Sequence, residues 1–116
     1  MVADEDITCY KALIKLSCED DAYITPIKGY PVSNDIVNHK GLMKPSKLSK
    51  VEKDSYYTYV GEGYIHTYAN AVDAATFTDS NCDIFECVIP KGTEYWADRN
   101  GYELAARKIR FVEQVN

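Results

Sequence analysis

The sequence predicts a single α+β domain built mainly on an antiparallel sheet, with one short helix and a long lysine-rich loop. Three observations support this prediction. The chain has 116 residues, enough for one domain with a modest core. Five of the six residues from 84 to 89 are apolar, which is typical of a buried strand. Turn-forming residues separate short stretches of high strand propensity along the rest of the chain.

The stretch from residue 83 to residue 96 organises the predicted sheet, and it reads D-I-F-E-C-V-I-P-K-G-T-E-Y-W. Proline has no N–H and a fixed φ, so we expect Pro90 to end the strand. Lys91 and Gly92 then supply a turn, and extended aromatic chain follows. Glu86 is the one charge in the strand, and we expect it to face solvent at one end of the sheet. A core strand and a hairpin corner account for the whole stretch.

The other predicted elements are short. Residues 7–16 favour a first strand with apolar side chains on one face and Lys11 and Lys15 on the other, although a helix would also give a partial apolar face. Residues 39–54 contain five lysines and several breakers, so they predict a long mobile loop. Residues 102–107 favour a loop or a helical turn. Further segments of high strand propensity are 22–27, 55–60, 64–68 and 108–113.

One short helix is predicted over residues 71–77. Asn70 is a favourable N-cap residue, and Asp73 follows it at the spacing of an imperfect capping box. The apolar pattern of this segment suggests that Val72 and Ala75 face inward.

The charge of the chain limits its partners. The formal net charge is −5, which argues against general nucleic-acid binding because phosphate neutralisation requires a basic face. Residues 1–6 form an acidic N-terminus that we expect to be flexible. Glu19, Asp20 and Asp21 form a second acidic group, which could bind a basic partner or lie in a solvated loop. Ten tyrosines favour a binding role, because tyrosine is enriched at interfaces.

The cysteines and the apolar segments point to a cytoplasmic protein without a membrane span. The four cysteines, at 9, 18, 82 and 87, match no zinc-site spacing, and no other metal site is indicated. No secretory signal is visible, and no apolar run approaches the ~20 residues of a membrane helix. Reduced thiols are therefore expected, whereas a removed signal would allow two disulfides.

His66 is the residue most suggestive of chemistry. If Ile65 and Thr67 face one way, His66 shares the other face with Tyr64 and Tyr68, just before the predicted helix. Such a face beside a helix N-terminus could hold an anion or a nucleotide ring. The alternative is a partly buried histidine satisfied by a nearby carbonyl. No motif for nucleophilic catalysis and no phosphate-binding loop is present in the sequence.

The segments G-E-G-Y-I-H-T-Y-A-N-A-V-D-A-A, I-F-E-C-V-I-P-K-G-T-E-Y-W and G-Y-E-L-A-A-R-K-I-R-F resemble a group of small bacteriophage and mobile-element proteins. The shared features are a glycine–histidine–aromatic segment, a short helix, a strand ending in Ile-Pro-Lys-Gly, and a final strand. The match covers roughly residues 61–111. The resemblance implies a phage origin and a place in the cytoplasm of a host bacterium.

A more distant resemblance is to the ADP-ribosyltransferase fold. It would place His66, Thr67 and Tyr68 near the nicotinamide side of a NAD cleft, with Lys11 where many of those enzymes have arginine. The usual Glu-x-Glu or Gln-x-Glu is missing near the end of the chain, so Glu103 would serve alone. This resemblance implies binding of NAD or ADP-ribose, with His66 and Glu103 as candidate catalytic residues.

Three functional hypotheses follow. The first is a non-enzymatic phage accessory protein that binds a host protein or a nucleotide signal, for example as a counter-defence inhibitor, with no resident cofactor. The second is a small ADP-ribosyltransferase-like enzyme or a degenerate NAD-binding relative. The third is a structural protein of the virion that self-associates into a homo-oligomer.

Overall fold

The computed structural model describes residues 1–15, 23–25, 31–32, 36–37, 40–44, 51–52, 59–60, 64–76, 82–98 and 100–116. Its strands are β1 (Ile7–Lys15), β2 (Tyr23–Ile24), β3 (Pro31–Val32), β4 (Leu42–Met43), β5 (Val51–Glu52), β6 (Tyr59–Val60), β7 (Ile65–Tyr68), β8 (Asp83–Ile89), β9 (Tyr95–Ala97), β10 (Glu103–Ala106) and β11 (Ile109–Gln114), and its helix α2 spans Ala71–Thr76.

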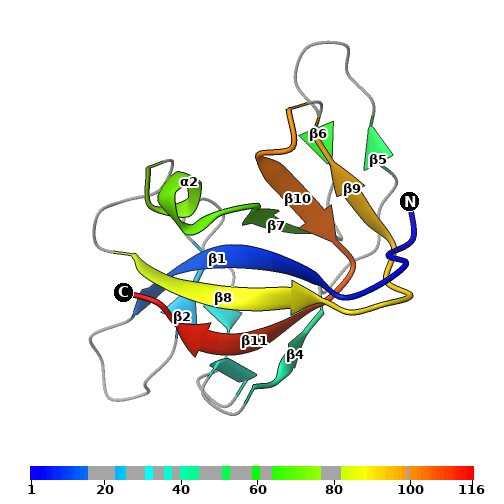
Figure 1. The fold of residues 1–116 in the computed structure, drawn as a ribbon. Coiled ribbons are helices and arrows are strands. Elements are labelled where there is room, and N and C mark those ends of the chain that lie inside the picture. The colour runs from blue at the N-terminus through cyan, green and yellow to red at the C-terminus, as the bar shows by residue number, and fades with distance from the viewer. Residues whose placement is uncertain are drawn as a thin grey trace.

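Among the described residues, nine strands form one sheet and β5 and β6 form a second, two-stranded one (Figure 1). The main path runs β4-β11-β8-β1-β7-β10-β9, with β2 pairing with β1 and β3. Its pairs are antiparallel. The predicted antiparallel single domain with a short helix is confirmed, but the structure is so rich in sheet that α+β describes it only loosely.

The strand β8 lies in the interior of the sheet, as its apolar sequence predicted. It pairs with β1 over seven positions, from Ile7 opposite Ile89 to Leu13 opposite Asp83, and with β11 on its other side. The Phe85 ring meets the Phe111 ring edge-to-face at 5.6 Å, in the largest group of buried side chains. This packing fixes the main core on one face of β1, β8 and β11.

Helix α2 covers part of the opposite face, where Ala74 packs with Ala12, Cys82 and Ile84. The predicted N-cap is confirmed, since the Asp73 N–H donates to Asn70 Oδ1 at 2.8 Å. The predicted inward face is wrong, because Val72 is 73% exposed and Ala75 is also exposed. Small Ala74 fills the contact instead, since a short side chain lets the helix lie close to the sheet.

The acidic segment 1–6, expected to be flexible, makes hydrogen bonds to the turn before β9. The Ala3 N–H donates to the Thr93 carbonyl at 2.9 Å, and the Lys91 N–H donates to Asp6 Oδ1 at 2.8 Å. Backbone pairing with the turn before β9 therefore outweighs the acidic composition of this segment.

Two predicted loops contain strands. Residues 103–106 form β10 in place of the expected loop or helical turn. The segment 39–54 includes β4, which pairs with β11, and β5, which pairs with β6. Tertiary pairing has overridden the weak strand propensity of alanine in β10. The rest of the lysine-rich segment, including His39, lies outside the described residues, as do Glu19, Asp20 and Asp21.

Candidate binding surface on strands β7 and β10

Strand β7 divides its side chains between the core and the outside. Ile65 and Thr67 are buried, whereas His66 is exposed and Tyr68 is half-buried. The alternation follows from the two-residue repeat of a strand, so the prediction that His66 and Tyr68 share a face is confirmed. Tyr64 precedes the strand and packs with Ala105 on this same side.

Strand β10 brings a carboxylate to this face. In the antiparallel register Glu103 lies opposite Tyr68, and Ala105 lies opposite His66. The two candidate catalytic residues, His66 and Glu103, therefore lie on neighbouring strands and on one face of the sheet. Side chains directly opposite in such a pair have Cβ atoms roughly 5 Å apart, and diagonal neighbours remain within reach of long side chains.

The surroundings of Tyr68 are acidic. Partial burial raises the pKa of the Tyr68 phenol, and the negative charges of Glu103 and Asp73 raise it further. Partial burial and the charge of Asp98 likewise raise the pKa of the Glu103 carboxyl. We refer to His66, Tyr68, Asp73, Asp98 and Glu103 together as the β7–β10 surface.

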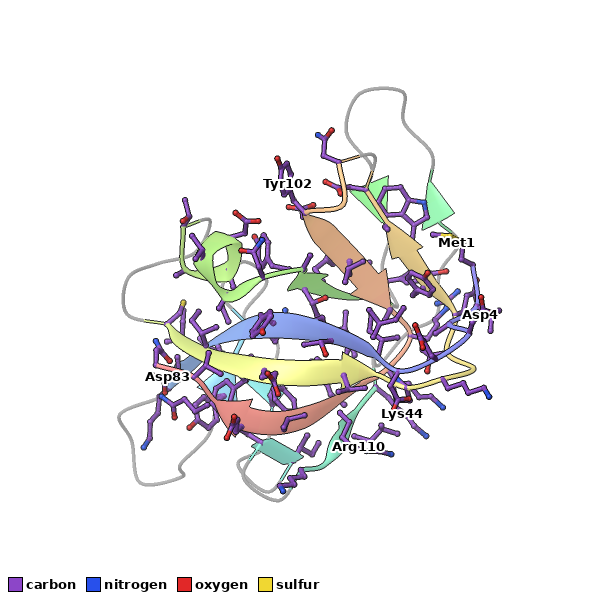
Figure 2. The ribbon with its side chains drawn as sticks, in the orientation of Figure 1. Met1, Asp4, Lys44, Asp83, Tyr102 and Arg110 are labelled. Atoms are coloured by element: carbon purple, nitrogen blue, oxygen red, sulfur yellow. The ribbon has the colours of Figure 1, made fainter. Side chains whose placement is uncertain are left out.

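Loop contacts hold the two sides of this surface in place. The Asp98 carboxylate accepts a hydrogen bond from the Tyr102 N–H at 2.8 Å, and the Tyr102 carbonyl accepts one from the Ala69 N–H at 2.8 Å. Figure 2 shows the Tyr102 side chain projecting from the start of β10, and it is 53% exposed. The β9–β10 turn is thus tied directly to the end of β7.

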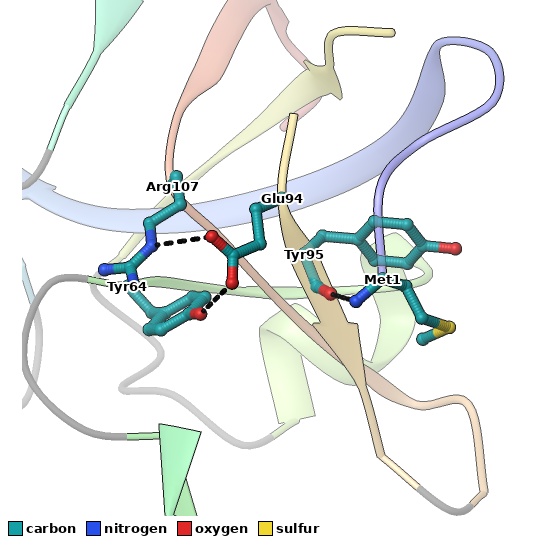
Figure 3. Close-up of polar contacts among 5 residues, drawn as sticks. All are labelled: Met1, Tyr64, Glu94, Tyr95 and Arg107. Atoms are coloured by element: carbon teal, nitrogen blue, oxygen red, sulfur yellow. Dashed lines mark hydrogen bonds and ion pairs between the residues drawn. The ribbon is translucent and has the colours of Figure 1, made fainter. Parts of the chain in front are cut away.

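The Tyr64 end of the face is closed by an ion pair. The Arg107 guanidinium lies 4.0 Å from the Tyr64 ring centroid, and its Nε is 3.5 Å from a Glu94 carboxylate oxygen (Figure 3). The Tyr64 hydroxyl donates to the same carboxylate at 3.1 Å. Burial and this hydrogen bond raise the pKa of Tyr64, while the Arg107 charge opposes the rise. Tyr64 is 7% exposed, so its ring packs beneath this face and offers little surface to a ligand.

Two predicted ligand-binding residues, Lys11 and Thr67, lie on the opposite side of the sheet from the side chains of His66 and Tyr68. Lys11 is 8% exposed and donates from Nζ to the His66 carbonyl at 2.8 Å. Thr67 is 1% exposed and donates from its hydroxyl to the Leu104 carbonyl at 2.9 Å. Both side chains point to the core side of the sheet, so the structure does not bring Lys11 and Thr67 together with the side chains of His66 and Tyr68. The acidic partner-binding residues Glu19, Asp20 and Asp21 lie outside the described residues.

No family model matches this sequence. No curated protein and no solved structure matches it either. The site must therefore be interpreted from its own geometry.

The described residues contain no group of three or more His, Cys, Asp or Glu side chains placed to hold a metal ion. Cys9, Cys82 and Cys87 are buried free thiols, and burial raises the pKa of Cys9 to about 11. Across the described ranges, no helix is long and apolar enough to cross a membrane.

The β7–β10 surface can attract a cation. The carboxylates of Glu103 and Asp73 act on Tyr68 and that of Asp98 acts on Glu103, and a tyrosine face itself attracts ammonium and guanidinium groups. Sequence reasoning found His66, Tyr68 and Glu103 but not Asp73 and Asp98 as their neighbours. It also missed Arg107 and Glu94, since only the strand register brings these residues to Tyr64.

Proposed function

We propose that this chain is a non-enzymatic binding protein whose β7–β10 surface receives a lysine or arginine side chain of a protein partner. The observation that carries the proposal is the pairing of Tyr68 with Glu103, with Asp73 and Asp98 close to the same groups. Carboxylates around an aromatic ring favour a cation through both charge and the ring quadrupole. The net charge of −5 supports steering of a basic partner toward the chain.

The setting of this interaction is part of the proposal. The resemblance of residues 61–111 to small bacteriophage and mobile-element proteins supports a partner from the host bacterium, met in its cytoplasm. A basic host protein, such as one that binds nucleic acid, would present the required side chains. Occupying that basic surface would make the chain a counter-defence inhibitor.

Isothermal titration calorimetry tests the proposal with a 12-residue peptide rich in lysine and arginine. We expect Glu103→Gln to weaken binding about tenfold, since a charge-assisted hydrogen bond contributes ~1.5–3 kcal/mol. Glu5→Gln is the matched control, because it removes the same charge from an exposed position on the N-terminal segment. Equal losses in the two variants, or binding by neither the wild type nor a variant, would refute the proposal.

A second candidate function is binding of NAD or ADP-ribose. It is favoured by the placement of His66 and Glu103 on neighbouring strands of one face. It is opposed by the carboxylates of Asp73 and Asp98, which repel a pyrophosphate group. A thermal-shift scan with both ligands decides this, because a hundredfold excess over Kd stabilises a protein by ~2.7 kcal/mol. We expect no shift, and a shift abolished by His66→Ala would favour the nucleotide.

A further inference from the structure

Strands β1 and β7 separate soon after they meet. They pair at a single position, Tyr10 opposite Tyr68, whereas β1 pairs with β8 over seven positions. If the antiparallel register continued, the next paired positions would place Ala12 opposite His66. Strand β7 instead leaves β1 and pairs with β10 over four positions. Among the described residues, the pairing of β7 with β1 therefore ends before it reaches His66.

The side chain of Lys11 forms a hydrogen bond to β7 at this point. Its Nζ donates to the His66 carbonyl oxygen at 2.8 Å, and only 8% of the residue is exposed. Lys11 lies between Cys9 and Leu13 on the core-facing side of β1, where an apolar residue would be expected. Burying an ammonium group is costly, and replacing a buried charge by an apolar side chain is often neutral or stabilising. Core packing alone therefore does not explain a lysine at this position.

We infer that Lys11 is a positioning residue that holds β7 where it departs from β1, and so fixes the placement of His66 and Tyr68. An ammonium carries three donors, and the described part of the chain gives this one a single acceptor, the His66 carbonyl. The bond reaches β7 from the core side, opposite to the β7–β10 surface. Any effect of Lys11 on peptide binding rests on the proposed function, whereas its role in positioning β7 does not.

The titratable groups that interact with Lys11 are the thiols of Cys87 on β8 and Cys9 on β1, which lie on its own side of the sheet, and that of Cys82 on the opposite side. Burial lowers the pKa of Lys11 to about 8, and interactions with these three thiols oppose the decrease. At neutral pH the hydrogen bond to His66 is therefore charge-assisted, the stronger kind. Above about pH 8 the amine is a weaker donor, so the hold on β7 loosens.

Amide hydrogen exchange of the Lys11→Met variant tests this inference. We expect the amides of residues 65–68 to exchange about tenfold faster than in the wild type, relative to those of 84–88, since one charge-assisted bond is lost. Leu13→Val is the matched control, because it lies on the same strand and the same face and only shrinks the core. It should accelerate exchange evenly in β7 and β8. An even acceleration in Lys11→Met as well would overturn the inference.

The wild-type protein provides a second test that does not depend on the folding of a variant. Nuclear magnetic resonance can follow the Lys11 side chain and the amides of residues 66–68 from pH 6.5 to pH 9.5. We expect these amide signals to move with the Lys11 titration near pH 8, while those of 84–86 do not. Independence of the β7 amides from Lys11 would overturn the inference. Failure of the proposed function is separate, since it would show as absent peptide binding in the wild type.

Discussion

Glu103 on β10 lies directly opposite Tyr68 on β7, and its negative charge, together with partial burial, raises the pKa of the Tyr68 phenol. The two residues are more than thirty positions apart in the sequence, and the antiparallel register of β7 with β10 brings them together. This pairing makes the face of β7 and β10 acidic at the point where a tyrosine ring is accessible. The proposed binding of a basic side chain depends on this pair.

The pKa of Tyr68 should respond to Glu103. Glu103→Gln removes a negative charge, so the Tyr68 pKa is expected to fall toward its ordinary value of 10.0, while partial burial keeps it from falling further. A nuclear magnetic resonance titration of the tyrosine ring signals measures this change. Glu5→Gln should leave the Tyr68 pKa where it is, and an equal decrease in both variants would show that Glu103 has no specific effect.

Arg107 should contribute to stability through its contacts with Tyr64 and Glu94. We expect Arg107→Ala to lower the free energy of unfolding by about 1–2 kcal/mol, combining a cation–π contact with a partly exposed ion pair. Urea denaturation measures the change. Arg110→Ala removes an exposed arginine from β11 and should cost less than about 0.5 kcal/mol. Similar losses in the two variants would contradict the role of Arg107.

Two buried threonines offer a matched pair. Thr67 donates its hydroxyl hydrogen to the Leu104 carbonyl, whereas the buried Thr93 hydroxyl has no hydrogen-bond partner within the described part of the chain. Replacing Thr67 by valine should therefore cost about 1 kcal/mol, while the same change at Thr93 should be neutral or stabilising. Thermal unfolding of both variants measures the contrast. A greater loss at Thr93 than at Thr67 would be inconsistent with these contacts.

Lys11 should make stability depend on pH. Its pKa is lowered from 10.5 to about 8 in the folded protein, so between these values the unfolded chain holds the proton and the folded chain does not. The stability of the wild type relative to Lys11→Met should therefore rise by up to about 3 kcal/mol as pH rises from 8 to 10.5. This gain in stability should be lost again as the pH falls from 10.5 through 8.

Urea denaturation of the wild type and of Lys11→Met between pH 8 and pH 10.5 gives the difference in their free energies of unfolding. The raised pKa of Cys9, about 11, opposes the trend above pH 9, but it does so in both proteins and largely cancels. A difference that stays constant with pH would mean that Lys11 is not buried as described.

Local patterns in the sequence predicted much of the sheet. The apolar run of β8, the alternation of β7 and the Asn70 cap each depend on neighbours within a few residues, so they can be inferred without a structure. Strand β10 was missed because Leu104 and two alanines gain their strand character from pairing with β7 and β9. Local propensity contains no information about such partners.

The candidate site was predictable only in part. The alternation of β7 indicated that His66 and Tyr68 share a face, but it could not show which neighbours lie beside them. Lys11 was assigned to a ligand site through the resemblance to the ADP-ribosyltransferase fold, and the alternating pattern of residues 7–16 placed it on the face away from the apolar side chains. The structure places it in the core, where a strand separation leaves a carbonyl for it to bind.

The most direct test of the central claim is to map where a basic peptide binds. The ¹⁵N-labelled wild-type protein would be titrated with the lysine- and arginine-rich peptide at low and at physiological salt, with an acidic peptide as control. The account predicts amide shifts concentrated at residues 66–68, 73, 98 and 103, weaker at higher salt and strongly reduced in Glu103→Gln. Shifts spread evenly over the acidic residues, or centred away from Tyr68 and Glu103, would contradict it.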